Sequence, residues 1–386
     1  MHFLFESLIF VHEKGKISAD SFKERIMQDN SMSRWLSPLM AFCLTFIIIA
    51  TLAPVVGIQF ERQFDFWLLW LGTMLFLALP ITYLEIALAK RSKTTALNAL
   101  SGLTRDADAS ARWRLVGWLA VIFIPFLAGA VLFNAAQLIQ LQMIPDFAPH
   151  LVFLAMAVVA LIGSFIPRQF LVPVTALGVI ISLITANTLG TPAASWQWTS
   201  VEFSEWGSAT VLALVASGLG LGLYWQSSLP RVQTQNAVTG TVLPIWFAQL
   251  VAVIAFGFFV ANGELPVIAL VITALAAAAL FIQFAREQLL QRQVAIVLQW
   301  AILLIALLVW AIPEIYSALN LVLMLWGLII CLIYAIFAGW IMKISHLRKS
   351  MNFSNELFYN LWRIAVRIVL PLSILLAMVA IIRQFI

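Results

Sequence analysis

The sequence predicts an all-α integral membrane protein with about eleven transmembrane helices. Two observations support this fold class. Of the 386 residues, 63% are hydrophobic and only 10% are charged, whereas soluble domains are about 25% charged. The apolar residues also gather in stretches of roughly 18 residues or more, which is the length that crosses a hydrocarbon layer of about 30 Å. A chain of this composition is expected to have lipid as its main solvent.

Eleven such stretches follow one another along the chain. They are residues 36–58, 64–89, 113–141, 150–167, 169–189, 206–229, 237–262, 265–286, 293–312, 315–342 and 361–384. The polar segment before them, residues 1–34, is expected to lie in the cytoplasm. Translation could start at Met1, whose apolar neighbours would suit an interfacial helix, or at Met32, which leads directly into the first stretch.

The basic residues are distributed unevenly between these stretches. With the N-terminus in the cytoplasm, the connections on that side hold all of the 22 lysines and arginines except Arg62 and Arg383. The outer connections carry acidic residues instead, among them Glu61, Glu202 and Glu264. Adding or removing one helix would destroy this asymmetry, which follows the positive-inside rule. We therefore expect a cytoplasmic N-terminus and an external C-terminus, and the short loops favour a bacterial inner membrane.

Neither an active site nor a metal centre is indicated. Cys43 and Cys331 fall in apolar stretches, where a free cysteine behaves as a small hydrophobe. The four histidines have no metal-ligand or triad spacing, and there is no phosphate-binding glycine loop. The basic residues are not gathered on one face that could follow a nucleic acid. We expect no enzyme, no resident cofactor and no nucleic-acid partner. The expected partners are the lipid bilayer and a small-molecule solute.

Several segments resemble the neurotransmitter:sodium symporter family, whose bacterial members carry amino acids. The matches are Leu79–Ala89 to G-x-P-x-x-x-x-E-x-x-x-G, Trp113–Trp118 to W-R-x-V-G-W, Ser217–Gly220 with Ser228–Pro230 to S-L-G-x-G…Y-L-P, and Ala335–Trp340 with Leu361–Pro371 to A-I-F-x-G-W…W-R-x-x-I-R-Y-x-x-P. They occur in the family's order over residues 35–384. The resemblance implies a LeuT-like fold with two inverted five-helix repeats, residues 35–190 and 205–342. A cytoplasmic loop and an eleventh helix follow in residues 343–386.

In that family the first and sixth helices break near the middle of the membrane, and the freed backbone groups bind solute and cations. Gly218, Gly220 and Gly222 predict such a break in the sixth helix, because each glycine costs about 1 kcal/mol in a helix relative to alanine. The alternative is a stripe of small residues that packs against a neighbouring helix. In the first helix the unwound segment falls on Thr51–Pro54. Pro54 lacks a backbone donor and would free the carbonyl of Ala50.

These considerations nominate a set of site residues. The solute-binding candidates are Thr51, Ala53, Pro54, Asn134, Ser217, Gly218 and Gly220. Ala50 and Thr273 are the sodium candidates, and Glu85, Arg62 and Tyr224 are gating or structural candidates. Glu85 is the one carboxylate deep in a predicted span, which makes it a functional-site hypothesis. The family's matching glutamate supports the broken sixth helix, so hydrogen bonds to amides near Gly218 are expected; proton transfer is the alternative.

Much of the family's ligand set is missing. The asparagine of the first helix has no counterpart, the tyrosine of the third falls on Ala130 or Val131, and the asparagine or aspartate of the seventh falls near Pro244. Hard cations need several oxygen ligands, so this loss disfavours sodium coupling. Two functions remain: a secondary transporter that moves a small amino-acid-like solute by alternating access, or a non-transporting membrane partner or regulator on a retained scaffold.

Overall fold

The computed structural model describes residues 35–56, 63–189, 195–257, 267–342, 344–353 and 355–385. Within these ranges all the named secondary-structure elements are helices or helical turns. Gln63 and Gln197 form an isolated β-bridge. The all-α prediction is confirmed. Seven of the described helices are long and apolar enough to cross a membrane, and three shorter apolar helices accompany them. The number of eleven crossings stays a prediction.

The elements of the first half follow the predicted stretches closely. They are the helix Trp35–Leu52, α2 (Phe64–Thr73), the π-helical turn η1 (Met74–Ala78), α3 (Leu79–Ser92), α4 (Ala96–Asp106), the 3-10 turn η2 (Ala111–Arg114), α5 (Leu115–Gln142), α6 (Pro149–Gly163) and α7 (Arg168–Leu189). α2, η1 and α3 make one continuous helix. α4 was not predicted, because its 11 residues form a short amphipathic helix, with polar residues between the apolar ones, and are too few to span a membrane.

The first helix is shorter than predicted. It ends at Leu52 rather than at residue 58, and turns follow over Ala53–Val56. Pro54 explains the early end, since proline has no amide hydrogen with which to continue the helical ladder. The next two amides, of Val55 and Val56, both donate to the carbonyl of Leu52. The carbonyls of Ala50 and Thr51, four residues before Pro54 and Val55, are therefore available to other partners.

The second half begins with a helix that is interrupted. Its elements are α8 (Phe203–Leu214), α9 (Leu223–Thr234), α10 (Thr239–Ala255), α11 (Val267–Gln291), α12 (Ile296–Leu308), the 3-10 turns η4 (Val309–Ala311) and η5 (Pro313–Ile315), α13 (Tyr316–Ile336), the π-helical turn η6 (Phe337–Ile341), α14 (Ile344–Met351), α15 (Glu356–Ile364), the π-helical turn η7 (Ala365–Val369) and α16 (Leu370–Phe385). The predicted stretch 206–229 is thus two helices rather than one.

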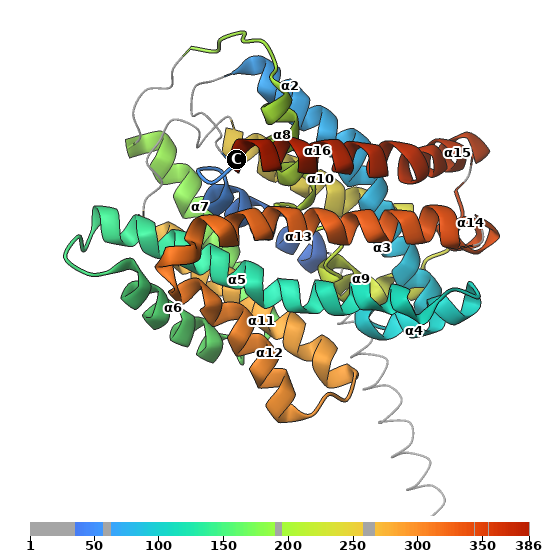
Figure 1. Cartoon of the computed structure of the whole chain (residues 1–386), viewed down its shortest axis with the longest axis horizontal. Coiled ribbons are helices and arrows are strands. Elements are labelled where there is room, and N and C mark those ends of the chain that lie inside the picture. The colour runs from blue at the N-terminus through green and yellow to red at the C-terminus, as the bar shows by residue number, and fades with distance from the viewer. Residues whose placement is uncertain are drawn as a thin grey trace, which may run out of the picture.

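The long helices lie side by side. α13 runs along the long axis of the molecule between α5 and α16 (Figure 1). α11 packs against both α5 and α7, and α8 packs against α16. Many large apolar side chains on α6, α7, α12 and α16 are exposed, as expected for helices that face lipid. The broken pair α8–α9 lies inside this bundle and is almost completely buried around the break.

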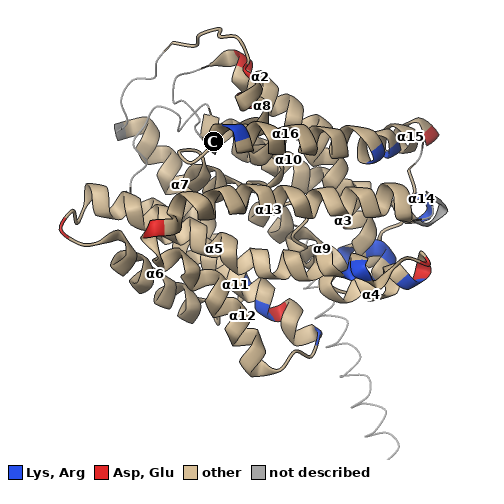
Figure 2. Ribbon diagram, viewed as in Figure 1, with Lys and Arg blue, Asp and Glu red and all other residues tan. Residues whose placement is uncertain are grey.

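Charged residues concentrate at the ends of the helices. Lysines and arginines gather at the end that carries α4, α14 and the start of α15 (Figure 2). We call this the basic end. Asp146 follows α5 and Glu202 precedes α8, and acidic residues are seen at the opposite side of the molecule, near α2 and beside α5 (Figure 2). This asymmetry agrees with the charge pattern in the sequence, whereas the orientation in a membrane stays a prediction.

Candidate functional site

The candidate site is centred on the interruption between α8 and α9. Residues 215–222 leave the helical conformation, and Gly218, Gly220 and Gly222 have φ angles of +66°, +76° and +78°. A residue with a Cβ atom is strained in this left-handed region, whereas glycine adopts it freely. The predicted break in the sixth helix is confirmed. The three glycines serve the backbone conformation, so the alternative of a small-residue packing stripe does not account for them.

Glu85 of α3 stabilises both sides of the break. Its Oε2 accepts a hydrogen bond from the amide of Gly220 at 3.0 Å, and its Oε1 accepts one from the amide of Trp225 at 3.0 Å. Trp225 lies in the first turn of α9, where amides have no partner within the helix. The capping residue of α9 is Gly222, which has no side chain to offer. A carboxylate from another helix therefore caps α9, at the positive end of the helix dipole.

The carbonyl of Ser217, which the break frees, is also satisfied. It accepts hydrogen bonds from the hydroxyl of Tyr224 at 2.8 Å and from Nε2 of Gln249 on α10 at 3.1 Å. The next carbonyl but one, of Leu219, accepts from the thiol of Cys331 on α13 at 3.4 Å. Tyr224 and Ser217, which were predicted separately as gating and solute-binding residues, thus contact each other directly.

A second polar chain begins where the first helix ends. The carbonyl of Thr51 accepts a hydrogen bond from Nδ2 of Asn134 on α5 at 3.1 Å, and Oδ1 of Asn134 accepts one from the hydroxyl of Tyr316 on α13 at 2.6 Å. The end of the first helix is thereby tied to α5 and α13. Asn134 was nominated from the sequence as a polar residue in an apolar stretch. Tyr316 was missed, because nothing in its local sequence shows that it reaches Asn134.

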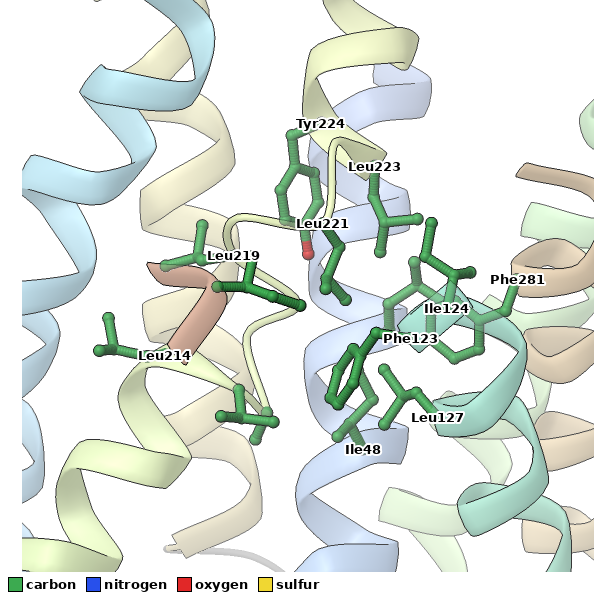
Figure 3. Close-up of a cluster of buried hydrophobic side chains, with 14 of the residues drawn as sticks. Ile48, Phe123, Ile124, Leu127, Leu214, Leu219, Leu221, Leu223, Tyr224 and Phe281 are labelled. Atoms are coloured by element: carbon green, nitrogen blue, oxygen red, sulfur yellow. The ribbon is translucent and has the colours of Figure 1, made fainter. Parts of the chain in front are cut away.

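The surroundings of the break are apolar. Side chains from the first helix, from α5, from α11 and from the break itself converge there (Figure 3). Those labelled and fully or almost fully buried include Ile48, Phe123, Ile124, Leu127, Leu214, Leu219, Leu221, Leu223 and Phe281. The polar contacts near the break are therefore few and are made mostly to backbone atoms.

A small cavity adjoins Glu85. Its volume is about 10 Å³, and it is lined by Ile81, Leu84, Glu85, Leu88, Gly220, Gly222, Trp225 and Tyr334. A space of this size is close to the minimum that one water molecule needs. This cavity is far too small for a solute of amino-acid size. It places free space directly against the carboxylate and two of the glycines of the break.

The remaining predicted residues lie in different surroundings. Thr273 donates a hydrogen bond from Oγ1 to the carbonyl of Ala269 in its own helix at 2.6 Å. It also lies against α7, since a Cβ atom on Gly178 would come within 2.1 Å of Thr273 Oγ1. Ala50 and Ala53 are buried and Pro54 is exposed. Arg62 lies outside the described residues. The assignment of Ala50 and Thr273 to a cation stays a prediction.

Comparison with known proteins places this geometry in a known fold. No protein-family model matches the sequence, and no curated protein matches it. Among solved structures, MhsT in complex with L-phenylalanine matches with a TM-score of 0.59 at 15% identity, over 90% of this chain and 98% of that chain. A manganese transporter of Eremococcus coleocola matches with a TM-score of 0.59 at 14% identity, over 95% of this chain and 89% of that chain. The predicted LeuT-like fold is confirmed.

Proposed function

We propose that this chain is a secondary transporter, a divergent relative of the neurotransmitter:sodium symporters, which moves a small and fairly apolar amino-acid-like solute by alternating access. The break between α8 and α9, stabilised by Glu85, carries this proposal. A break inside a membrane helix leaves backbone amides and carbonyls without partners in their own helix, and such breaks are typical of the solute and ion sites of transporters. A helix that served only to fill the bundle would need neither three left-handed glycines nor a buried carboxylate to cap its second half.

The chemistry around the break suits a small amphiphilic solute. Amides and carbonyls at a helix break can bind amino and carboxylate groups, and the neighbouring Ile48, Phe123 and Phe281 would contact an apolar side chain. MhsT, which shares the fold, has been solved with L-phenylalanine. A divalent metal cation fits less well, since the described residues include no group of three His, Cys, Asp or Glu side chains that could hold a metal ion.

Sodium coupling is not part of the proposal. The carbonyl of Ser217, which a broken helix could offer to a cation, already accepts two hydrogen bonds from Tyr224 and Gln249. Two donors now occupy the directions from which a cation would approach. Thr273 directs its hydroxyl to Ala269 in its own helix and packs against α7. We therefore expect transport that proceeds equally well in sodium and potassium media.

A non-transporting partner or regulatory protein on the same scaffold is the second candidate. The observation that favours it is the close apolar packing around the break, where Leu219, Leu221 and Phe281 are almost completely buried (Figure 3). Such packing would lock a transporter in one conformation. The two candidates therefore differ in whether α9 moves relative to the helices around it.

Uptake into proteoliposomes separates the two candidates. The purified full chain is reconstituted, and uptake of a panel of radiolabelled amino acids is measured in sodium medium and in potassium medium, each with and without a pH gradient. The proposal expects saturable uptake of an apolar amino acid at the same rate in both media. Gly220→Val should abolish this uptake and Glu314→Gln, at an exposed site, should leave it unchanged. Absence of uptake by folded protein across the whole panel would favour the partner protein.

A further inference from the structure

Three arginines converge at the basic end, where α14 meets α15. Arg363 in α15 and Arg367 in η7 lie four residues apart on one continuous helix, so they are close to the same face. Arg348 of α14 forms an ion pair with Glu356 at the start of α15. In the described part of the chain, Arg363 and Arg367 have no carboxylate partner. Two positive charges therefore remain uncompensated at this place.

Arg367 is held against an exposed tryptophan, Trp340. Its Nε donates to the carbonyl of Gly339 in η6, and its guanidinium lies 5.2 Å from the centre of the Trp340 ring. In return, Nε1 of Trp340 donates to the carbonyl of Arg367 at 3.1 Å. Gly339 permits this approach, because a Cβ atom there would lie 3.0 Å from Cγ of Arg367. The hydrogen bond uses Nε and leaves the two terminal nitrogens of the guanidinium for another partner.

The same region presents an apolar surface that continues along the bundle. Trp340 is 61% exposed. The exposed large apolar side chains of α15, η7 and α16 are Leu357, Phe358, Leu361, Ile364, Ile368, Leu372, Leu375, Leu376, Val379 and Ile382. From α15 the helix continues into α16, which runs away from the basic end (Figure 1). A ligand that bound here would meet positive charge at one end and a long apolar face at the other.

We propose that Arg363, Arg367 and Trp340 bind the headgroup of an anionic phospholipid, whose acyl chains lie along the exposed face of α15 and α16. A positive charge inside a membrane is costly unless it is paired, and a lipid phosphate supplies the missing negative charge. The planar guanidinium matches two phosphate oxygens at once. Basic pockets between transmembrane helices, near the membrane surface, are the usual sites for such headgroups. This lipid site is independent of the proposed transport activity.

Native mass spectrometry of the full chain tests the site. The protein is stripped of lipid in detergent and incubated with phosphatidylglycerol or with phosphatidylcholine. We expect at least one phosphatidylglycerol to stay bound under conditions that remove phosphatidylcholine. Arg363→Gln should reduce the bound fraction severalfold. Arg112→Gln removes the same charge from an exposed position of the basic end outside this cluster, and it should leave the bound fraction unchanged. An equal loss of bound phosphatidylglycerol in both variants would refute the site, since binding would then depend only on the net charge of the basic end.

Thermal unfolding in nanodiscs gives a second readout. The wild-type chain should unfold at a higher temperature in nanodiscs that contain phosphatidylglycerol than in pure phosphatidylcholine, and Arg363→Gln should lose most of this difference. Arg367→Lys keeps the charge but loses the paired guanidinium donors. This variant should therefore retain only part of the difference in unfolding temperature between the two kinds of nanodisc. Inorganic phosphate in the phosphatidylcholine sample should not substitute for the lipid. A shift of the same size in the wild type and in Arg363→Gln would refute the proposal.

Discussion

Replacement of Glu85 tests whether a carboxylate holds the break together. In the structure its two oxygens each accept one backbone amide, from Gly220 and Trp225, at 3.0 Å. A hydrogen bond to a charged group contributes about 1.5–3 kcal/mol, and a buried donor left without a partner is costly. Glu85→Ala removes both bonds, so we expect it to lower the free energy of unfolding by about 3–6 kcal/mol. Glu85→Gln keeps one acceptor oxygen and should cost about half as much.

The free energy of unfolding can be measured by titration with sodium dodecyl sulfate in mixed micelles, with helix content followed by circular dichroism. Glu314→Gln is the matched control, since Glu314 is exposed and surface substitutions usually change stability by less than about 0.5 kcal/mol. The free energy of unfolding should be highest for the wild type, lower for Glu85→Gln and lowest for Glu85→Ala. If Glu85→Gln were as stable as the wild type, the second amide bond would contribute nothing and the capping argument would fail.

Three further predictions concern the backbone and its neighbours. Gly220→Ala places a Cβ atom at a φ of +76° and should cost about 1–2 kcal/mol in the same titration; no loss would mean that the left-handed turn is not required. Gly178→Ala should destabilise because of the clash with Thr273 Oγ1. Thr273→Ala added to it should restore part of the lost stability, since Thr273 Cβ and the Ala269 carbonyl would still lie close to the new Cβ atom; losses that simply add would mean that Thr273 Oγ1 does not lie against Gly178. Tyr316→Phe removes the hydroxyl that donates to Asn134 and should cost about 1 kcal/mol. Asn134→Leu in the same background should add a further loss of about 1 kcal/mol, because it also removes the hydrogen bond to the Thr51 carbonyl; no further loss would mean that this second bond does not contribute to stability.

The features that the sequence predicted correctly rest on local chemistry. Three glycines in a leucine-rich stretch indicate a break whatever that stretch packs against, because glycine destabilises the helical backbone itself. A lone carboxylate in an apolar stretch has to find donors nearby, and a capped break provides them. Glu85 could therefore be paired from sequence with amides near Gly218, with the resemblance to a known family as a guide, and the structure shows that these amides belong to Gly220 and Trp225.

What could not be predicted depends on how helices face one another. The hydrogen bond between Gln249 and the Ser217 carbonyl, and the one between Tyr316 and Asn134, join residues on separate helices. Their existence depends on the rotation of each helix about its own axis. These helices are apolar nearly all round, so their sequences do not indicate which face of each helix points toward which neighbour. For the same reason Thr273 was assigned to a cation without any indication that its hydroxyl lies against α7.

The attachment of one carboxylate to both Gly220 and Trp225 has a mechanical consequence. Glu85 belongs to the continuous helix that contains α3. Its two hydrogen bonds therefore join α3, the end of the break at Gly220 and the start of α9 into one unit that would move together. The segment from Val215 to Leu219 lies on the other side of this attachment and has no bond to Glu85. If α9 swings relative to α8, the chain has to bend within that short segment, the hydrogen bond between the Tyr224 hydroxyl and the Ser217 carbonyl has to stretch or break, and α3 has to move together with α9.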